Sequence, residues 1–386
     1  MAIINEDAQR NGAFADDSDG LLPDEHPRRP SRCVDIGKLQ IGGQNKIAVQ
    51  SMTNTRTEDV DATAEQIKRL EEAGCDIVRA SVYSMQCAQA ISRIKEKTSL
   101  PFVADVHFDH RLAIAAAENG ADKLRINPGN ITKPEYVSMV VDCAKQHNIP
   151  IRIGVNAGSL NKDIKARFGN GPRALVESAM QNVSMLEKRG FYNTVISVKA
   201  SSVPVMVRSY ELLARLCDYP LHLGVTEAGD IYDGAVKNAA GLGALLLEGI
   251  GDTIRVSLTG DPVAEVHAAH DILRALGMYK GGVEIISCPT CGRTRVALES
   301  VVRKVKEETR GIRCPLKVAV MGCAVNGPGE ASDADIGIAC GEGKGVLFVK
   351  GRVICALPEE KLAEELIKRI HQASLLQDNG ENQHKH

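Results

Sequence analysis

The chain has 386 residues, of which 44% are hydrophobic and 3% aromatic, with no tryptophan and a formal net charge of −2 at pH 7. So little excess charge and so few aromatic rings argue against a nucleic-acid partner and favour a small, soluble ligand. No apolar run reaches the roughly 18 residues that a membrane span needs, so we expect a cytoplasmic protein with no membrane partner. The length predicts one large domain and one smaller domain.

Residues 1–32 form the first segment of the chain. They lack the apolar core of a signal peptide, and their acidic residues are not typical of an organelle transit peptide. We interpret them as a disordered tail.

Residues 33–280 carry a repeated pattern of a short segment rich in Val, Ile and Leu, a polar or glycine-bearing turn, and a stretch with apolar residues at helical spacing. Strands that alternate with helices lie parallel, and eight such units predict a closed (β/α)8 TIM barrel. An open doubly wound sheet is the alternative, but no G-x-G-x-x-G follows the first strand. The predicted strands lie in residues 47–55, 76–84, 101–109, 123–130, 150–159, 194–202, 221–229 and 253–262.

Residues 281–375 show a different rhythm and predict a second, smaller α/β domain, with Gly281 and Gly282 as the hinge. We expect a frayed tail over residues 376–386. The predicted strands are 281–287, 316–322, 334–339 and 345–351, and the predicted helices are 293–311 and 358–376.

Three of the eleven cysteines stand out. Cys288 and Cys291 form a C-x-x-C pair, and Cys323 lies in "GCAVNGPGE", seven residues before Glu330. An odd number of cysteines in a reducing compartment argues against a disulfide framework and for metal binding or catalysis. The spacing leaves three interpretations open: an iron–sulfur cluster with a weaker oxygen ligand, zinc with Cys314 as the fourth thiolate, or a thioredoxin-like dithiol. The dithiol leaves Cys323 unexplained, and the cluster suits the set best.

Polar side chains recur where the predicted barrel strands end, which is the face that carries the chemistry in TIM barrels. Any one arginine could be a surface ion pair, but several cations at one face suit the oxygens of a diphosphate. Lys199 also permits a Schiff-base aldolase, and Glu227 permits an acid–base role or a counter-charge. These strand-end residues are Arg56, His107, Arg125, Asn127, Arg152, Asn156, Lys199, Glu227 and Arg255.

The motifs taken together resemble a known family. "VQSMTNT", "ADVHFDHR", "LRINPGN", "IPIRIGVNAGSL", "SVKAS", "GVTEAG", "GDTIRVSL", "SCPTCGRT" and "GCAVNGPGE" are similar to segments of the bacterial 4-hydroxy-3-methylbut-2-enyl diphosphate synthases, over residues 33–375. The resemblance implies reductive ring opening of 2-C-methyl-D-erythritol 2,4-cyclodiphosphate in the non-mevalonate isoprenoid pathway. It also implies electrons from reduced ferredoxin or flavodoxin.

The resemblance further implies roles for single residues. A 4Fe-4S cluster would be held by Cys288, Cys291, Cys323 and Glu330, with Cys314 not a ligand, and Glu227 would lie near the reacting carbons. The family works as a homodimer in which the cluster domain of one subunit caps the barrel of the other. Its substrate-binding positions fall on Arg56, His107, Arg125, Arg152, Asn156, Lys199 and Arg255.

Overall fold

The computed structural model describes residues 27–383, apart from 128–129, 132, 295, 324–330 and 332. The chain divides into two compact units. One comprises the residues up to Ile67 together with Cys75–Val266, and the other comprises Lys68–Gly74 and the residues from His267 onward. In the part of the chain that is described, no helix has the length and apolar character needed to cross a bilayer.

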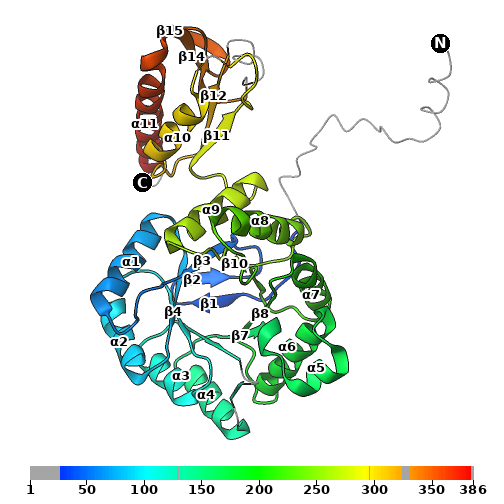
Figure 1. The fold of residues 1–386 in the computed structure, drawn as a ribbon. Coiled ribbons are helices and arrows are strands. Elements are labelled where there is room, and N and C mark those ends of the chain that lie inside the picture. The colour runs from blue at the N-terminus through cyan, green and yellow to red at the C-terminus, as the bar shows by residue number, and fades with distance from the viewer. Residues whose placement is uncertain are drawn as a thin grey trace, which may run out of the picture. The chain divides into compact units, whose positions relative to one another are not determined.

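The first unit is a TIM barrel, as the sequence predicts (Figure 1). In the described chain its eight strands pair in parallel in the order β8-β7-β6-β5-β4-β3-β10-β9, and a bridge between Ile196 and Leu221 joins β8 to the segment that leads into β9. The strands are β3 (Ala48–Met52), β4 (Ile77–Ser81), β5 (Phe102–Asp105), β6 (Lys123–Ile126), β7 (Ile151–Asn156), β8 (Thr194–Lys199), β9 (His222–Leu223) and β10 (Thr253–Ile254).

Helices surround these strands and bury their apolar sides against them (Figure 1). In α2, for example, the buried residues Cys87, Ile91 and Ile94 recur at helical spacing, and the Ser84 hydroxyl caps the helix by accepting the Cys87 N–H. The helices are α1 (Val60–Glu72), α2 (Met85–Lys95), α3 (His110–Glu118), α4 (Pro134–Gln146), α5 (Lys162–Phe168), α6 (Pro172–Glu187), α7 (Val203–Leu216), α8 (Ile231–Leu247) and α9 (Pro262–Ala275).

The amino-terminal end of the barrel is closed by a hairpin that the sequence analysis did not predict. It consists of β1 (Val34–Ile36) and β2 (Leu39–Ile41), joined by a turn in which Gly37 has φ of +57°. Each strand is only three residues long, too short for a recognisable alternation of apolar and polar residues. Its apolar side chains share one buried cluster with residues at the starts of the barrel strands, namely Ala48, Ile77, Val103 and Val195.

Residues 27–32 lie against the barrel, although we expected the disordered tail to run to residue 32. Arg28 Nη2 lies 2.9 Å from the Asp252 carboxylate, and Arg29 Nη2 donates to the Tyr219 carbonyl at 2.6 Å. Ser31 Oγ also donates to Asp252 at 2.7 Å. These contacts fix residues 27–32, which we call the strap, across the loops that precede β9 and β10.

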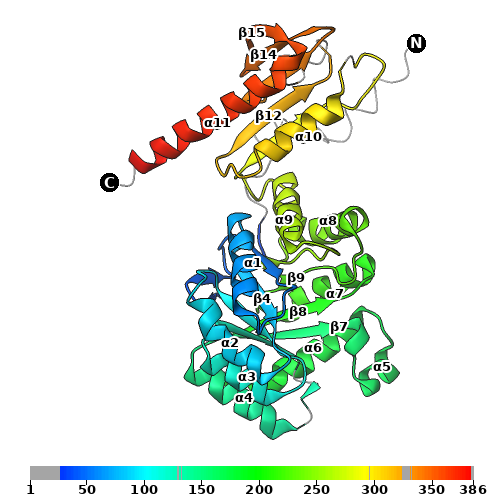
Figure 2. The same ribbon diagram turned by 60° about the vertical axis from the view of Figure 1, so that its left-hand side comes forward.

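The second unit is a mixed sheet covered by two helices on one face (Figure 2). In its described residues, β11, β12 and β13 are parallel and β13, β14 and β15 are antiparallel. The strand β15 was not predicted from the sequence, and α11 runs past residue 376, where we expected fraying to begin. The elements are β11 (Val283–Ser287), α10 (Leu298–Glu308), β12 (Leu316–Met321), β13 (Ile336–Cys340), β14 (Lys344–Val349), β15 (Arg352–Pro358) and α11 (Glu359–Gln383).

The hairpin predicts a test of barrel stability. Ile36 is fully buried, so Ile36→Ala should lower the free energy of unfolding by about 2–5 kcal/mol through lost burial and the cavity left behind. The measurement is urea denaturation followed by circular dichroism. Lys38→Ala, an exposed change in the same turn, serves as the control and should alter the free energy by less than about 0.5 kcal/mol. Equal stabilities for the two variants would show that the hairpin does not support the barrel.

Candidate active site

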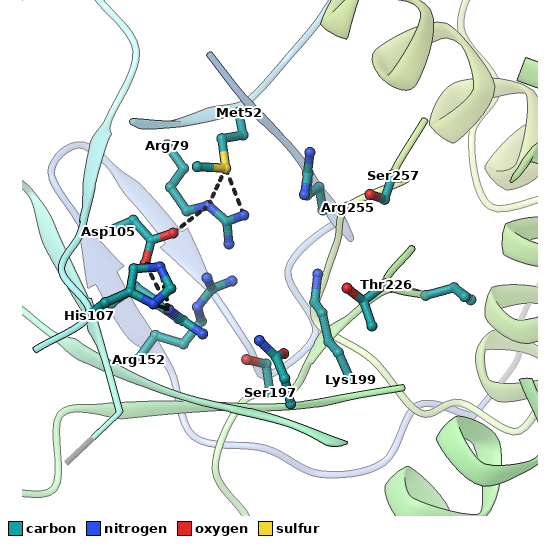
Figure 3. Close-up of a pocket in the computed structure, with 13 residues that line it drawn as sticks. Met52, Arg79, Asp105, His107, Arg152, Ser197, Lys199, Thr226, Arg255 and Ser257 are labelled. Carbon is teal, nitrogen blue, oxygen red and sulfur yellow. Dashed lines mark hydrogen bonds and ion pairs between the residues drawn. The ribbon is translucent and has the colours of Figure 1, made fainter. Parts of the chain in front are cut away.

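A pocket of about 230 Å³ opens at the carboxyl ends of the barrel strands (Figure 3). Parallel strands bring their carboxyl ends to one face, so residues far apart in sequence meet there. Most of the residues predicted from strand ends line it: His107, Arg125, Arg152, Asn156, Lys199 and Arg255. The other lining residues are Met52, Arg79, Asp105, Ser197, Val225, Thr226 and Ser257.

Three predicted barrel residues do not line this pocket. The Arg56 side chain is 82% exposed and its guanidinium lies 2.8 Å from the Glu58 carboxylate. Asn127 is buried after β6 and accepts a hydrogen bond from Asn182. Glu227 is exposed after β9, with φ of +54°. Their predicted substrate-binding or catalytic roles stay predictions.

Asp105 is the carboxylate that lines the pocket, and it lies close to two arginines and a histidine. Its oxygens lie 3.0 Å from Arg125 Nη1, 3.6 Å from Arg79 Nε and 3.6 Å from His107 Nε2. Burial opposes ionisation of Asp105, but Arg79, His107 and Arg125 outweigh it and hold the pKa well below its usual range. Burial lowers the pKa of Arg79 to about 10, against the attraction of Asp105. Both groups are therefore charged at neutral pH.

Glu265, in the first turn of α9, is a second buried carboxylate that fixes a pocket cation. Its oxygens accept hydrogen bonds from Arg255 Nη2 at 2.9 Å, the Ser51 hydroxyl at 2.9 Å and the Leu258 N–H at 3.1 Å. Glu265 thus holds Arg255 in place and ties the segment after β10 to β3.

Arg152 and Lys199 are buried cations of a different kind. Among the described residues, neither has a carboxylate within ion-pair distance, and Nε and Nη1 of Arg152 have no hydrogen-bond partner. Burial first, and then the neighbouring cations, lowers the pKa of both groups well below their ordinary values. Unpaired buried charge is costly unless a ligand of opposite sign neutralises it. The pocket is therefore suited to an anion.

Arg79, Asp105 and Glu265 were not predicted from the sequence. Asp105 does end a strand, β5, whereas Arg79 lies within β4 and Glu265 lies on a helix. Arg79 is anchored by Met52, whose sulfur accepts hydrogen bonds from Nη2 at 2.8 Å and from Nε at 3.1 Å. The available signal was an arginine within the otherwise apolar strand "DIVRAS".

The second unit holds the predicted metal-binding cysteines. Cys288 directly follows β11 and Cys323 lies just after β12, and these strands pair in parallel with Ser287 opposite Val320. Both loops therefore leave the same edge of the sheet, and the Gly322 N–H donates to Cys288 Sγ at 3.2 Å. Cys291 is exposed, and hydrogen bonds from the Arg293 and Thr294 backbone contribute to lowering the pKa of its thiol.

The cysteines suit a thiolate-bound metal group in two ways. Thiolates are the right kind of ligand, and the loops of Cys288 and Cys323 leave the same edge of the sheet. Soft thiolates select iron–sulfur clusters or zinc, and N–H···S hydrogen bonds are typical around cluster sulfurs. Within the described residues, no three His, Cys, Asp or Glu side chains are already gathered for a metal, and the predicted ligand Glu330 lies outside those residues.

Cys314 does not belong to this group. It precedes β12 and is buried in the core between the sheet and its helices. The strand that separates it from Cys323 has six residues, which spans about 20 Å. This placement argues against the zinc site that uses Cys314 as its fourth ligand.

Comparison with known proteins agrees with this geometry. The description "GcpE TIM-barrel domain" matches residues 31–270, and "GcpE protein C-terminal domain" matches residues 284–372. A 4-hydroxy-3-methylbut-2-en-1-yl diphosphate synthase (flavodoxin) from Caldanaerobacter subterraneus subsp. tengcongensis is 57% identical over 89% of this chain and 97% of its own length. The enzyme of the same name from Clostridium perfringens is 54% identical over 89% of this chain and 99% of its own length.

A third relative of that name, from Desulfotalea psychrophila, is 51% identical and covers 93% of this chain and 98% of its own length. Among solved structures, a dihydropteroate synthase from Stenotrophomonas maltophilia is similar with a TM-score of 0.48 and 16% identity, covering 64% of this chain and 98% of that one, too weak a likeness to inform function. Two adjoining domain matches and relatives of more than half identity over nearly the whole chain lead to one conclusion: the chain belongs to the GcpE family.

Proposed function

We propose that the chain catalyses the reductive ring opening of 2-C-methyl-D-erythritol 2,4-cyclodiphosphate to 4-hydroxy-3-methylbut-2-enyl diphosphate, in the non-mevalonate route to isoprenoid precursors. It is an oxidoreductase with a small-molecule substrate, and flavodoxin, named in its relatives, is its electron donor. The observation that carries the assignment of the pocket is its unneutralised positive charge, in a chain that matches the family along both domains.

The diphosphate of the substrate is the anion that this pocket suits. Guanidinium groups match phosphate oxygens in pairs, and an ammonium supplies a point charge beside them. Arg152 and Lys199, which have no acidic partner among the described residues, gain most from such a ligand. Fixing the diphosphate also fixes the attached ring, so that orientation is set before reduction begins.

A 4Fe-4S cluster held by Cys288, Cys291, Cys323 and Glu330 is the cofactor we propose. When bound, it would deliver two electrons one at a time, which no protein side chain can do. Glu330 is the proposed exchangeable ligand, because a carboxylate binds iron more weakly than thiolates do. Full turnover by Glu330→Ala with an intact cluster would contradict that role.

Glu227 is the proposed proton donor, at the rim after β9. A homodimer and a cytoplasmic location stay predictions from the family resemblance and the composition. A lysine-dependent aldolase is the rival that Lys199 permits. Borohydride with a phosphorylated sugar that carries a free carbonyl would trap an aldolase covalently at Lys199, and we expect no such adduct.

The cluster proposal predicts a result for metal content. Protein purified without oxygen should be brown and hold about four irons per chain with matching sulfide, and Cys323→Ser should lose both. Cys314→Ala is the matched control and should keep its iron, since Cys314 lies in the core at the opposite end of β12 from Cys323. Zinc in place of iron in the unaltered protein would end the redox mechanism.

The charge of Lys199 predicts a pH-dependent effect on stability. The folded protein holds the Lys199 pKa below its ordinary value, so the unfolded chain binds this proton more tightly. The resulting loss of folding stability is greatest at low pH and vanishes above the unfolded pKa of about 10.4. Lys199→Met should therefore raise the denaturation midpoint at pH 7, and the gain should shrink as the pH approaches 10.

The same reasoning predicts proton uptake on binding. A diphosphate beside Lys199 favours its charged form, so calorimetry with inorganic pyrophosphate in buffers of different ionisation enthalpy should show more protons taken up by the unaltered protein than by Lys199→Met. Comparing the two proteins cancels the protonation of pyrophosphate itself. Equal uptake would mean that Lys199 does not face the ligand.

A further inference from the structure

Asp105 is a negative charge inside a pocket that suits an anion. It ends β5 and only 4% of its surface is exposed. By Coulomb's law alone, a carboxylate there repels a diphosphate, and replacing it with a neutral side chain should strengthen binding. The contacts of Asp105 point to the opposite effect.

Asp105 lies between two arginines from the neighbouring strands. Arg79 on β4 and Arg125 on β6 reach it from either side, and His107 Nε2, on the loop that follows β5, lies 3.6 Å from it (Figure 3 shows Arg79 and His107). Arg79 also donates to the Met52 sulfur, and Arg125 Nη2 lies 3.4 Å from the Gly154 carbonyl. Each guanidinium therefore has one edge held by the protein and further N–H groups left over.

Gly154 supports the same arrangement. A Cβ atom at this position would lie 2.4 Å from Arg125 Nε, which no real side chain tolerates. The backbone of β7 thus leaves room for Arg125 to lie flat against it while Asp105 holds its Nη1. The position of Arg125 is fixed by both neighbouring strands.

We propose that Asp105 is a positioning residue for the anion, which holds Arg79 and Arg125 so that their remaining N–H groups face the diphosphate. The inference rests on the proposed function, since the diphosphate is the ligand that these groups meet. A fixed arginine loses little freedom when it binds, whereas a loose one must be ordered at the cost of affinity. When Asp105 is replaced, the affinity lost because the two arginines are no longer fixed exceeds the affinity gained because the repulsion is gone. Asp105 therefore strengthens binding.

Two variants of Asp105 separate charge from position. Asp105→Asn removes the negative charge, and Asp105→Glu keeps the charge but moves it by one methylene. If charge alone mattered, Asp105→Asn would bind pyrophosphate more tightly and Asp105→Glu would bind it equally well. The proposal predicts weaker binding for both, by about 10-fold to 100-fold for Asp105→Asn, the range for hydrogen bonds to charged groups.

The experiment is calorimetry of the full chain with inorganic pyrophosphate, with circular dichroism to confirm folding. Asp122→Asn is the matched control: Asp122 is also a carboxylate between β5 and β6, but it lies at their amino-terminal ends, where it accepts the Phe102 N–H at 2.7 Å. This variant should bind pyrophosphate as the unaltered protein does. Unchanged or tighter binding by Asp105→Asn or by Asp105→Glu would overturn the proposal.

A double-mutant cycle distinguishes positioning from general damage to the barrel. If Asp105 acts through Arg79, then Asp105→Asn should cost clearly less affinity in an Arg79→Gln background than in the unaltered protein. Equal costs in the two backgrounds would overturn the action through Arg79. With the cyclic diphosphate as substrate, Asp105→Asn should raise KM by more than it lowers kcat.

The same titrations separate this proposal from the proposed function. An unaltered protein that fails to bind pyrophosphate would overturn both, because no diphosphate would occupy the pocket. An unaltered protein that binds it, with Asp105→Glu binding equally well, would overturn the role of Asp105 alone.

Discussion

Buried positive charge at the barrel mouth is the constraint on which the site depends. In the described chain, Arg79, Arg125, Arg152, Lys199 and Arg255 line one pocket, and the carboxylates of Asp105 and Glu265 neutralise only part of their charge. Arginine keeps its charge at any physiological pH, so deprotonation of Lys199 alone cannot remove the excess. The fold places the cations in two sets: those fixed by a carboxylate and those left for the ligand.

This arrangement makes demands on the rest of the barrel. Repelling cations stay buried only if the strands that carry them cannot separate, and the interior of a TIM barrel normally holds apolar layers rather than charges. Here the apolar layer lies at the opposite end, where the hairpin packs against Ala48, Ile77, Val103 and Val195. The stability that the mouth gives up for binding is offset at the base, a division typical of enzymes whose sites are strained by their function.

A feature of the fold or of the site could be predicted only where it leaves a pattern in the sequence. The periodic strands predicted the barrel, and the shared face of their ends predicted His107, Arg125, Arg152, Asn156, Lys199 and Arg255 together. Arg79 and Glu265 lie off the strand ends, and their roles arise from partners distant in sequence: Ser51 and Glu265 are 214 residues apart. Arg56 and Glu227 follow the same strand-end rule but lie on exposed loops, since the rule fixes a face of the barrel and not the direction of a side chain. Glu330 falls outside the described residues, so its role rests on the resemblance.

The strap has a consequence for how the chain folds. Arg28 reaches Asp252 across 224 residues, and the strap and hairpin bring the first described residues against the loops that precede the last two barrel strands. Contacts of such sequence separation form late, because the loop that joins their partners must close first. During synthesis the residues of the strap emerge well before Asp252, so the strap contacts at the amino-terminal end of the barrel cannot form while the early strands are being made. The barrel can close only when nearly all of its own sequence has left the ribosome, which makes its completion a single late event rather than a gradual one.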